Sequence, residues 1–154
     1  MTSCAIVSFH GFGELEPTHC LLPRHGEPEA AARCLAEALA NALANADGPS
    51  DKGYPFGHSQ TLAEFMAAFL NGQRAVEVIH NLKLEATATY RYRISVMERR
   101  SEQLWLECWR LYPGDPGWKR RCGPMPLRAF IHHYRRRGQV SQHLPQAPNQ
   151  TLAP

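Results

Sequence analysis

The stretch VEVIHNLKLEATATYRYRISV, residues 76–96, decides how the chain folds. Its even-numbered residues are mostly apolar, and its odd-numbered residues are mostly polar or charged. Alternation with a period of two is typical of extended chain with one buried face and one solvated face. We therefore expect this stretch to form the spine of an antiparallel sheet whose even-numbered residues face the helices.

The same stretch is too long for one straight strand. Its 21 residues would span roughly 70 Å when extended, about twice the diameter of a compact chain of this length. The parity of its apolar positions never changes, which excludes a two-residue hairpin. We expect a bulge, a coil or an odd-length loop at His80-Asn81-Leu82, because Asn tolerates turn conformations.

Patterns in the N-terminal half predict one strand and two helices. Residues 4–9 are apolar and rich in strand formers, whereas 14–26, with two prolines, predict a loop or an irregular strand. Leucines spaced by four and a Pro near the start predict an amphipathic helix over 27–46. A loop over 49–58 leads to a second helix over 61–72, which opens with the capping box Thr-Leu-Ala-Glu.

The C-terminal half predicts two more strands and a last helix. A charged hairpin over 98–102 leads into a strand over 104–112. The run Pro-Gly-Asp-Pro-Gly at 113–117 is a strong turn signal, and 118–122 is the return strand. The last helix starts at Pro126, whose φ suits a first turn, and closes at Gly138.

Together these elements predict a single α+β domain over residues 1–138. An antiparallel β-meander packs against two N-terminal helices and one C-terminal helix. Residues 139–154 have little to bury, so we expect a disordered tail. The five scattered cysteines are typical of reduced thiols, and no signal or membrane-spanning segment is recognisable. We therefore expect a small soluble protein of the cytoplasm, with an arginine-rich, alanine-rich composition typical of bacterial or phage proteins.

The expected order of a helix, strands and a helix from Ser59 to Gly138 is similar to that of double-stranded RNA-binding domains. In that family the N-terminal end of the final helix presents basic residues to phosphates. In this chain that end reads Gly-Pro-Met-Pro-Leu-Arg over residues 123–128, with Arg128 as its only charge, and the strand expected over 118–122 is additional to the family's pattern. The basic run of this chain lies at the opposite end of the helix.

The net charge of +3 conceals a strong asymmetry along the chain. Residues 1–64 carry a balance of −5, and residues 65–154 carry +8. Residues 110–137 contain eight basic residues and a single acidic one, Asp115. Such an asymmetry indicates an anionic partner or head-to-tail self-association.

We expect the basic surface to be the binding site. Guanidinium groups match phosphate and carboxylate oxygens, although cations also stabilise the last turn of a helix and protect edge strands without any ligand. The favoured function is a non-enzymatic protein that binds nucleic acid. The alternative is a small regulator or inhibitor, of a phage or mobile-element kind, that binds an acidic or nucleic-acid-associated protein. The candidate binding residues are Lys119, Arg120, Arg121, Arg128, Arg135, Arg136, Arg137, Arg91 and Arg93.

Aromatic residues alternate with some of these cations and have two interpretations. Rings beside guanidinium groups suit stacked bases, but most such rings are core residues. For the tyrosines the core is favoured, because they share the parity of the valines and leucines. The residues concerned are Tyr90, Tyr92, Trp105, Trp109 and Trp118.

Evidence for a metal site or for catalysis is weak in the sequence. His10, His19, Cys20 and His25, with Cys4, form the one metal-like group, but they lack the paired short spacings of zinc sites. Cys20 and His19 are sequence neighbours, whose side chains diverge too far for a nucleophile and its base. Known catalytic motifs are absent, so we expect no cofactor and favour a protein that is not an enzyme.

Overall fold

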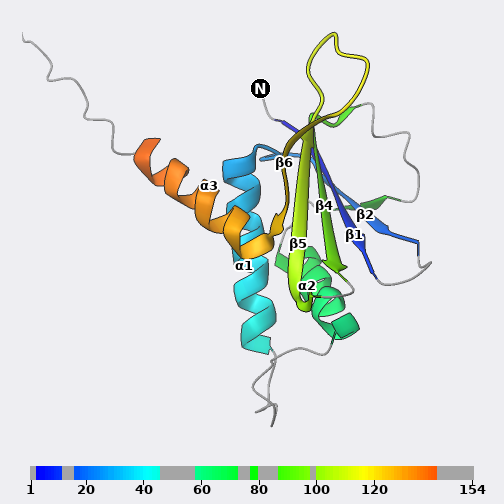
Figure 1. The fold of residues 1–154 in the computed structure, drawn as a ribbon, viewed down its shortest axis with the longest axis vertical. Helices are drawn as coiled ribbons and strands as arrows, with labels where there is room; N and C mark the ends of the chain where they lie inside the picture. Colours follow the sequence, from blue (N-terminus) through cyan, green and yellow to red (C-terminus); the bar gives the residue numbers. More distant parts are fainter. Residues whose placement is uncertain are drawn as a thin grey trace, which may run out of the picture.

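The computed structural model describes residues 3–11, 16–45, 58–72, 77–79, 87–97 and 100–141. A six-stranded mixed sheet is covered on one face by helices (Figure 1). The described elements are, in chain order, β1 (Ala5–His10), β2 (Thr18–Leu22), α1 (Pro28–Asn45), α2 (His58–Gly72), β3 (Glu77–Ile79), β4 (Tyr90–Met97), β5 (Arg100–Arg110), β6 (Lys119–Pro126) and α3 (Leu127–Ser141). The predicted α+β class is confirmed.

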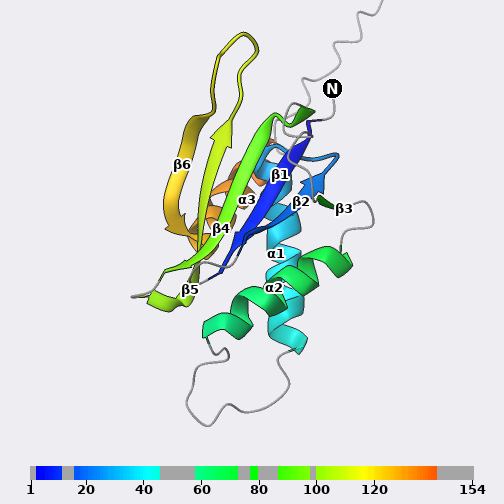
Figure 2. The same ribbon diagram turned by 90° about the vertical axis from the view of Figure 1, so that its right-hand side faces the viewer.

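The strands follow the order β3-β2-β1-β4-β5-β6, with β3 and β6 at the two edges (Figure 2). β4, β5 and β6 form an antiparallel meander, as predicted. The rest of the sheet corrects the prediction, because β1 pairs with β4 in parallel and extends the sheet through β2 and β3. A meander alone is therefore the wrong description of this sheet.

The alternating stretch 76–96 supplies two strands that do not touch. β3 lies at one edge of the sheet, and β1 and β2 separate it from β4. In β4 the even-numbered residues are buried, as predicted, but in β3 Val78 is 42% exposed while Ile79 is buried. Alternation reports the burial of each strand separately and says nothing about which strands pair. The predicted break at 80–82 lies outside the described residues.

The main core lies between the sheet and the helices. Phe9 of β1 contacts the rings of Phe65 and Phe69 on α2, and Tyr92 of β4 contacts Phe130 on α3. Tyr92 is fully buried and Tyr90 nearly so, which confirms that the tyrosines are core residues. A smaller cluster lies on the opposite face and contains Ile6, Ile79 and Ala88, packed against Cys4, Leu21 and Trp118.

Several element boundaries differ from the prediction. α2 begins at His58, so Thr61 lies inside the helix and not at its start. Gly123–Pro126 belongs to β6, because the chain stays paired with β5 up to the first residue of α3. α3 continues past Gly138 to Ser141. Residues 142–154, the hairpin tip at 98–99 and the predicted loop up to residue 57 lie outside the described part of the chain.

One buried hydrogen bond ties the central strand to the start of α1. The Tyr92 hydroxyl donates to the Gly26 carbonyl at 2.7 Å. We expect Tyr92→Phe to lower the free energy of unfolding by about 1–3 kcal/mol, because the buried carbonyl loses its partner. Urea denaturation measures the loss. Tyr112→Phe is the control: it removes an exposed hydrogen bond from Arg121 and should cost less than about 0.5 kcal/mol. Equal losses in the two variants would contradict this role of Tyr92.

A groove between α1 and α3 as the candidate binding site

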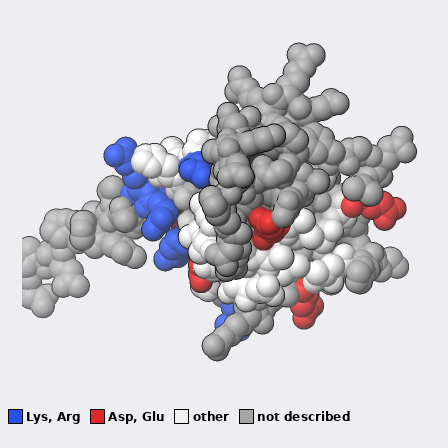
Figure 3. Space-filling view, turned by 90° about the horizontal axis from the view of Figure 1, so that it is seen from below, with Lys and Arg blue, Asp and Glu red and all other residues white. Residues whose placement is uncertain are grey.

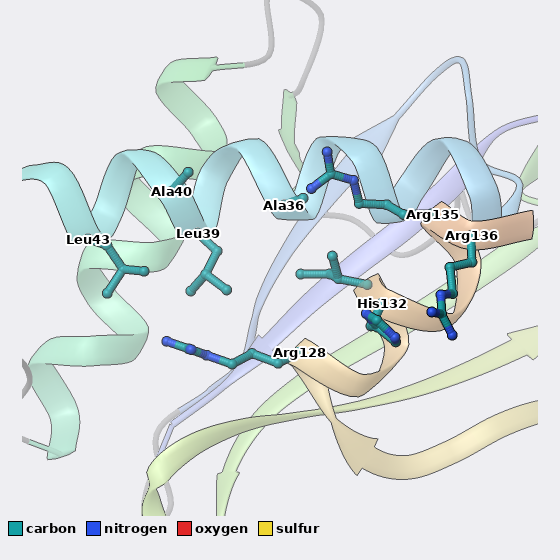
Figure 4. Close-up of a pocket in the computed structure, with 9 residues that line it drawn as sticks. Ala36, Leu39, Ala40, Leu43, Arg128, His132, Arg135 and Arg136 are labelled. Atoms are coloured by element: carbon teal, nitrogen blue, oxygen red, sulfur yellow. The ribbon is translucent and has the colours of Figure 1, made fainter. Parts of the chain in front are cut away.

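α1 and α3 pack side by side on the sheet and leave a groove of about 540 Å³ between them (Figure 4). Each helix contributes one straight stripe of residues. The lining residues are Ala36, Leu39, Ala40 and Leu43 from α1, and Arg128, Ile131, His132, Arg135 and Arg136 from α3. Residues three, four and seven apart lie on one face of a helix, so both stripes run along the groove.

The α1 side of the groove is apolar. Leu39 and Leu43 are only partly buried, although they continue the leucine stripe that begins with fully buried Leu35. The small side chains of Ala36 and Ala40 keep this flank shallow. The sheet and the neighbouring helices thus leave part of the apolar face of α1 exposed.

The α3 side of the groove is cationic. Arg128, Arg135 and Arg136 are exposed, and their side chains border the groove from the α3 side (Figure 4). Among the described residues that line the groove, none is acidic. Seen from below, Lys and Arg gather on the side where α3 lies in Figure 1 (Figure 3).

The helix dipole does not account for these arginines. Because α3 extends to Ser141, its last turn contains no basic residue, and Arg135 and Arg136 lie more than one turn from its C-terminus. Favourable interactions of cations with the dipole fall off within the last turn. Stabilisation of the helix end is therefore a poor explanation for the basic run.

The remaining predicted cations on the helix side do not line the groove. Lys119 forms an ion pair with Asp115, at 3.0 Å between Nζ and Oδ2. The Arg121 guanidinium donates to the Tyr112 hydroxyl at 2.9 Å. Arg137 is exposed on α3, outside the set of lining residues. Lys119 and Arg121 thus make their contacts at the β5–β6 turn, away from the groove.

Three predicted cations belong to the sheet face that the helices leave uncovered. Arg91, Trp109 and Arg120 are cross-strand neighbours on β4, β5 and β6. Arg93 of β4 lies between Ser8 of β1 and Glu107 of β5 in the register. The nine predicted residues therefore lie in four places: the groove, the β5–β6 turn, the part of α3 outside the groove, and the uncovered sheet face. Sequence reasoning found the cations of the groove but missed its apolar half, because a leucine stripe predicts core.

Two members of the predicted metal-like group, His10 and His19, lie together on the uncovered face beside Ser8, which sequence reasoning did not single out. Ser8 Oγ and His19 Nδ1 share a hydrogen bond at 2.6 Å, and the His10 ring meets the His19 ring edge-on. Ser8 is 1% exposed, so this serine is inaccessible as a nucleophile. The polar residues at positions 8 and 10, alternating with apolar ones, were the available signal for a polar face on β1.

His10 provides a pH-dependent probe of this face. Burial lowers the pKa of His10 to about 4, helped by the nearby charges of Arg93, His19 and Arg91. We expect the imidazole resonances of His10 to titrate near this pH in NMR spectra. Because this pKa lies below the unfolded value, the folding stability contributed by His10 is present above about pH 6.5 and is lost as the pH falls towards 4.

Arg93→Gln tests the cause of this shift. Removing the cation should raise the pKa of His10, whereas Arg33→Gln, a charge removal on α1, should leave it unchanged. An unchanged His10 titration in Arg93→Gln would show that the arginine does not contribute.

The metal-like group and the Cys20–His19 pair are not assembled into a site. His19 lies on the uncovered face, whereas Cys20 is buried on the helix side, and burial raises the pKa of Cys20 to about 11. His25 is exposed between β2 and α1. No group of three or more His, Cys, Asp and Glu that could hold a metal ion occurs within the described segments.

No family model, curated protein or solved structure matches this chain. The likeness to double-stranded RNA-binding domains remains one of element order, since β1 inserts beside β4 in the sheet. Within the segments that the structure covers, no helix has the length and apolar character needed to cross a membrane. The evidence on function is therefore the geometry of the surfaces.

Proposed function

We propose that the protein is a non-enzymatic binding protein that holds an acidic amphipathic helix of a partner protein in the α1–α3 groove. The observation that carries the proposal is an apolar wall from α1 facing a cationic wall from α3, with no acidic residue among the lining residues that the structure describes. Binding of this kind would make the protein a regulator or inhibitor of the complex to which its partner belongs.

The shape of the groove suits a helix. The α1 stripe from Ala36 to Leu43 runs for about 10 Å, or two helical turns, and the α3 stripe from Arg128 to Arg136 is similar in length. An incoming helix has matching residues at the same spacing, as in other helix-in-groove complexes. Its apolar residues would cover Leu39 and Leu43, which are partly exposed. They would also pack against Ile131, which lines the groove and is itself buried.

The charge of the groove determines the polarity of the partner. Carboxylates along one edge of the incoming helix would pair with Arg128, Arg135 and Arg136, whose planar guanidinium groups can each donate two parallel hydrogen bonds to a carboxylate. A phosphate backbone would use the same cations but would gain nothing from the apolar α1 wall. The combination therefore favours a protein helix over nucleic acid at this site.

The uncovered sheet face supports nucleic acid as a second candidate. Arg91 and Arg120 flank Trp109 in one cross-strand row. Trp109 and Arg91 are partly exposed and Arg120 is exposed, so a base could stack on the indole while its phosphates meet the cations. This candidate uses different residues from the groove, which makes the two functions separable by mutation.

Two double charge reversals form a matched pair that tests these functions. Arg128→Glu/Arg135→Glu changes the groove, and Arg93→Glu/Arg120→Glu changes the uncovered face; all four side chains are exposed. Both variants should melt within a few degrees of the wild type, because exposed charges contribute little to stability. Each immobilised protein is then incubated with a host-cell lysate and with labelled single- and double-stranded nucleic acids.

The groove proposal predicts that a specific protein is retained by the wild type and by the sheet-face variant. Its apparent affinity should fall at least tenfold in the groove variant. Loss of nucleic-acid binding in the sheet-face variant, with a steep dependence on salt, would instead support the second candidate. Equal capture by all three proteins would contradict both.

A further inference from the structure

Two cysteines face each other across the β5–β6 pair. Cys108 and Cys122 are direct partners in the antiparallel register, and both are free thiols. Directly opposed residues of an antiparallel pair have Cα atoms about 4.5–5.5 Å apart, which lies within the range of about 4.4–6.8 Å found across disulfides. The pair lies between two register shifts of the β5–β6 ladder, one between Leu106 and Cys108 and one between Cys108 and Trp109.

The two thiols differ in access. Cys108 is fully buried on the helix side of the sheet, next to Tyr92. Cys122 is only partly buried, and it lies on the edge strand β6. A small oxidant from solvent therefore meets Cys122 first, with Cys108 behind it.

The two thiols also differ in reactivity. The pKa of Cys122 is lowered by its hydrogen bond with Cys108, by the Arg121 guanidinium and by a hydrogen bond with Tyr134. The pKa of Cys108 is raised by its hydrogen bond with Cys122 and by burial. Because the thiolate is the reactive form, Cys122 is the nucleophile of the pair and Cys108 is the resolving thiol.

We propose that Cys108 and Cys122 form an oxidative modification site, which a peroxide converts into a cross-strand disulfide. The Cys122 thiolate attacks one peroxide oxygen, so that an S–O bond forms and the O–O bond breaks. The departing hydroxide takes a proton and leaves as water, and Cys122 becomes a sulfenic acid. Cys108 then attacks this sulfur, the S–S bond forms, and the sulfenic oxygen leaves as a second water. Two thiols and one hydrogen peroxide thus yield one disulfide and two waters, and a dithiol reductant reverses the change.

The other three cysteines lack this arrangement. Cys20 is buried on β2, Cys34 lies on α1, and Cys4 precedes β1. Burial raises the pKa of all three. We therefore expect peroxide to oxidise the Cys108–Cys122 pair selectively. This expectation does not depend on what the groove binds.

Peptide mapping of the full chain after stoichiometric hydrogen peroxide tests the site. We expect a linked peptide pair that contains Cys108 and Cys122, a mass lower by two hydrogen atoms, and full reversal by dithiothreitol. Before oxidation, iodoacetamide should alkylate Cys122 at least about ten times faster than any other cysteine. Disulfides between other cysteines, or no disulfide at equimolar peroxide, would overturn the proposal.

Two variants give an independent readout. In Cys108→Ser the sulfenic acid on Cys122 has no resolving thiol, so dimedone should trap it there. Cys34→Ser, the matched control, should form the Cys108–Cys122 disulfide as the wild type does. Labelling of Cys108→Ser by dimedone at another cysteine, or at none, would overturn the assignment of Cys122 as the nucleophile.

Discussion

Gly123→Ala is expected to lower the free energy of unfolding by about 3 kcal/mol. Gly123 has a φ of +91°, a conformation that costs an L-residue about 1–2 kcal/mol. An added Cβ would also overlap the Leu106 carbonyl oxygen and lie 2.8 Å from Glu107 Cα. Because both obstacles are backbone atoms of β5, relief requires β6 to move, at a further cost of about 1–3 kcal/mol.

Urea denaturation measures this loss, and Gly117→Ala is its control. Gly117 lies in the same β5–β6 connection and has open space around the position of a Cβ. Its replacement should change the stability by less than about 0.5 kcal/mol. If both variants were equally stable, β6 would not approach β5 closely at Gly123, and this description of how the chain enters α3 would be wrong.

Ala40→Trp is expected to reduce partner binding at least about a hundredfold, because an indole at this position fills the space that the partner's helix needs. Ala40 is exposed and lines the α1 side of the groove, so the melting temperature should hardly change. Isothermal titration of the captured partner measures the affinity. Ala44→Trp, one turn further along α1 and outside the lining, is the control. If the two variants bound the partner with equal affinity, the proposal that the groove is the binding site would be wrong.

The sequence predicts the elements of this fold better than their arrangement. The alternation in residues 90–96 and the leucine spacing in α1 reflect burial on one face, which each segment shows by itself. The parallel pairing of β1 with β4 has no such local signal, since any two apolar strands are compatible. Residues 76–96 were therefore predicted to break at 80–82 and still to form one spine of an antiparallel sheet, although β1 and β2 lie between its two strands.

The candidate site was predictable only in part, for a similar reason. Arg128, Arg135 and Arg136 are visible in the sequence as a basic helix face, but the groove exists only because α3 packs beside α1. Leu39 and Leu43 have the spacing of core residues, and the periodicity gives no measure of how much of that face the rest of the chain covers. Their partial exposure is a property of the tertiary structure.

Site-specific photo-crosslinking tests the central claim most directly. A photoreactive amino acid in place of His132, on the wall of the groove, is compared in cells with the same amino acid in place of Arg93 on the uncovered sheet face. The account predicts that position 132 cross-links to one protein, through a peptide with apolar residues at helical spacing flanked by carboxylates, and that Ala40→Trp abolishes this product. Cross-linking at position 93 in preference to 132, or cross-linking of position 132 to nucleic acid, would contradict it.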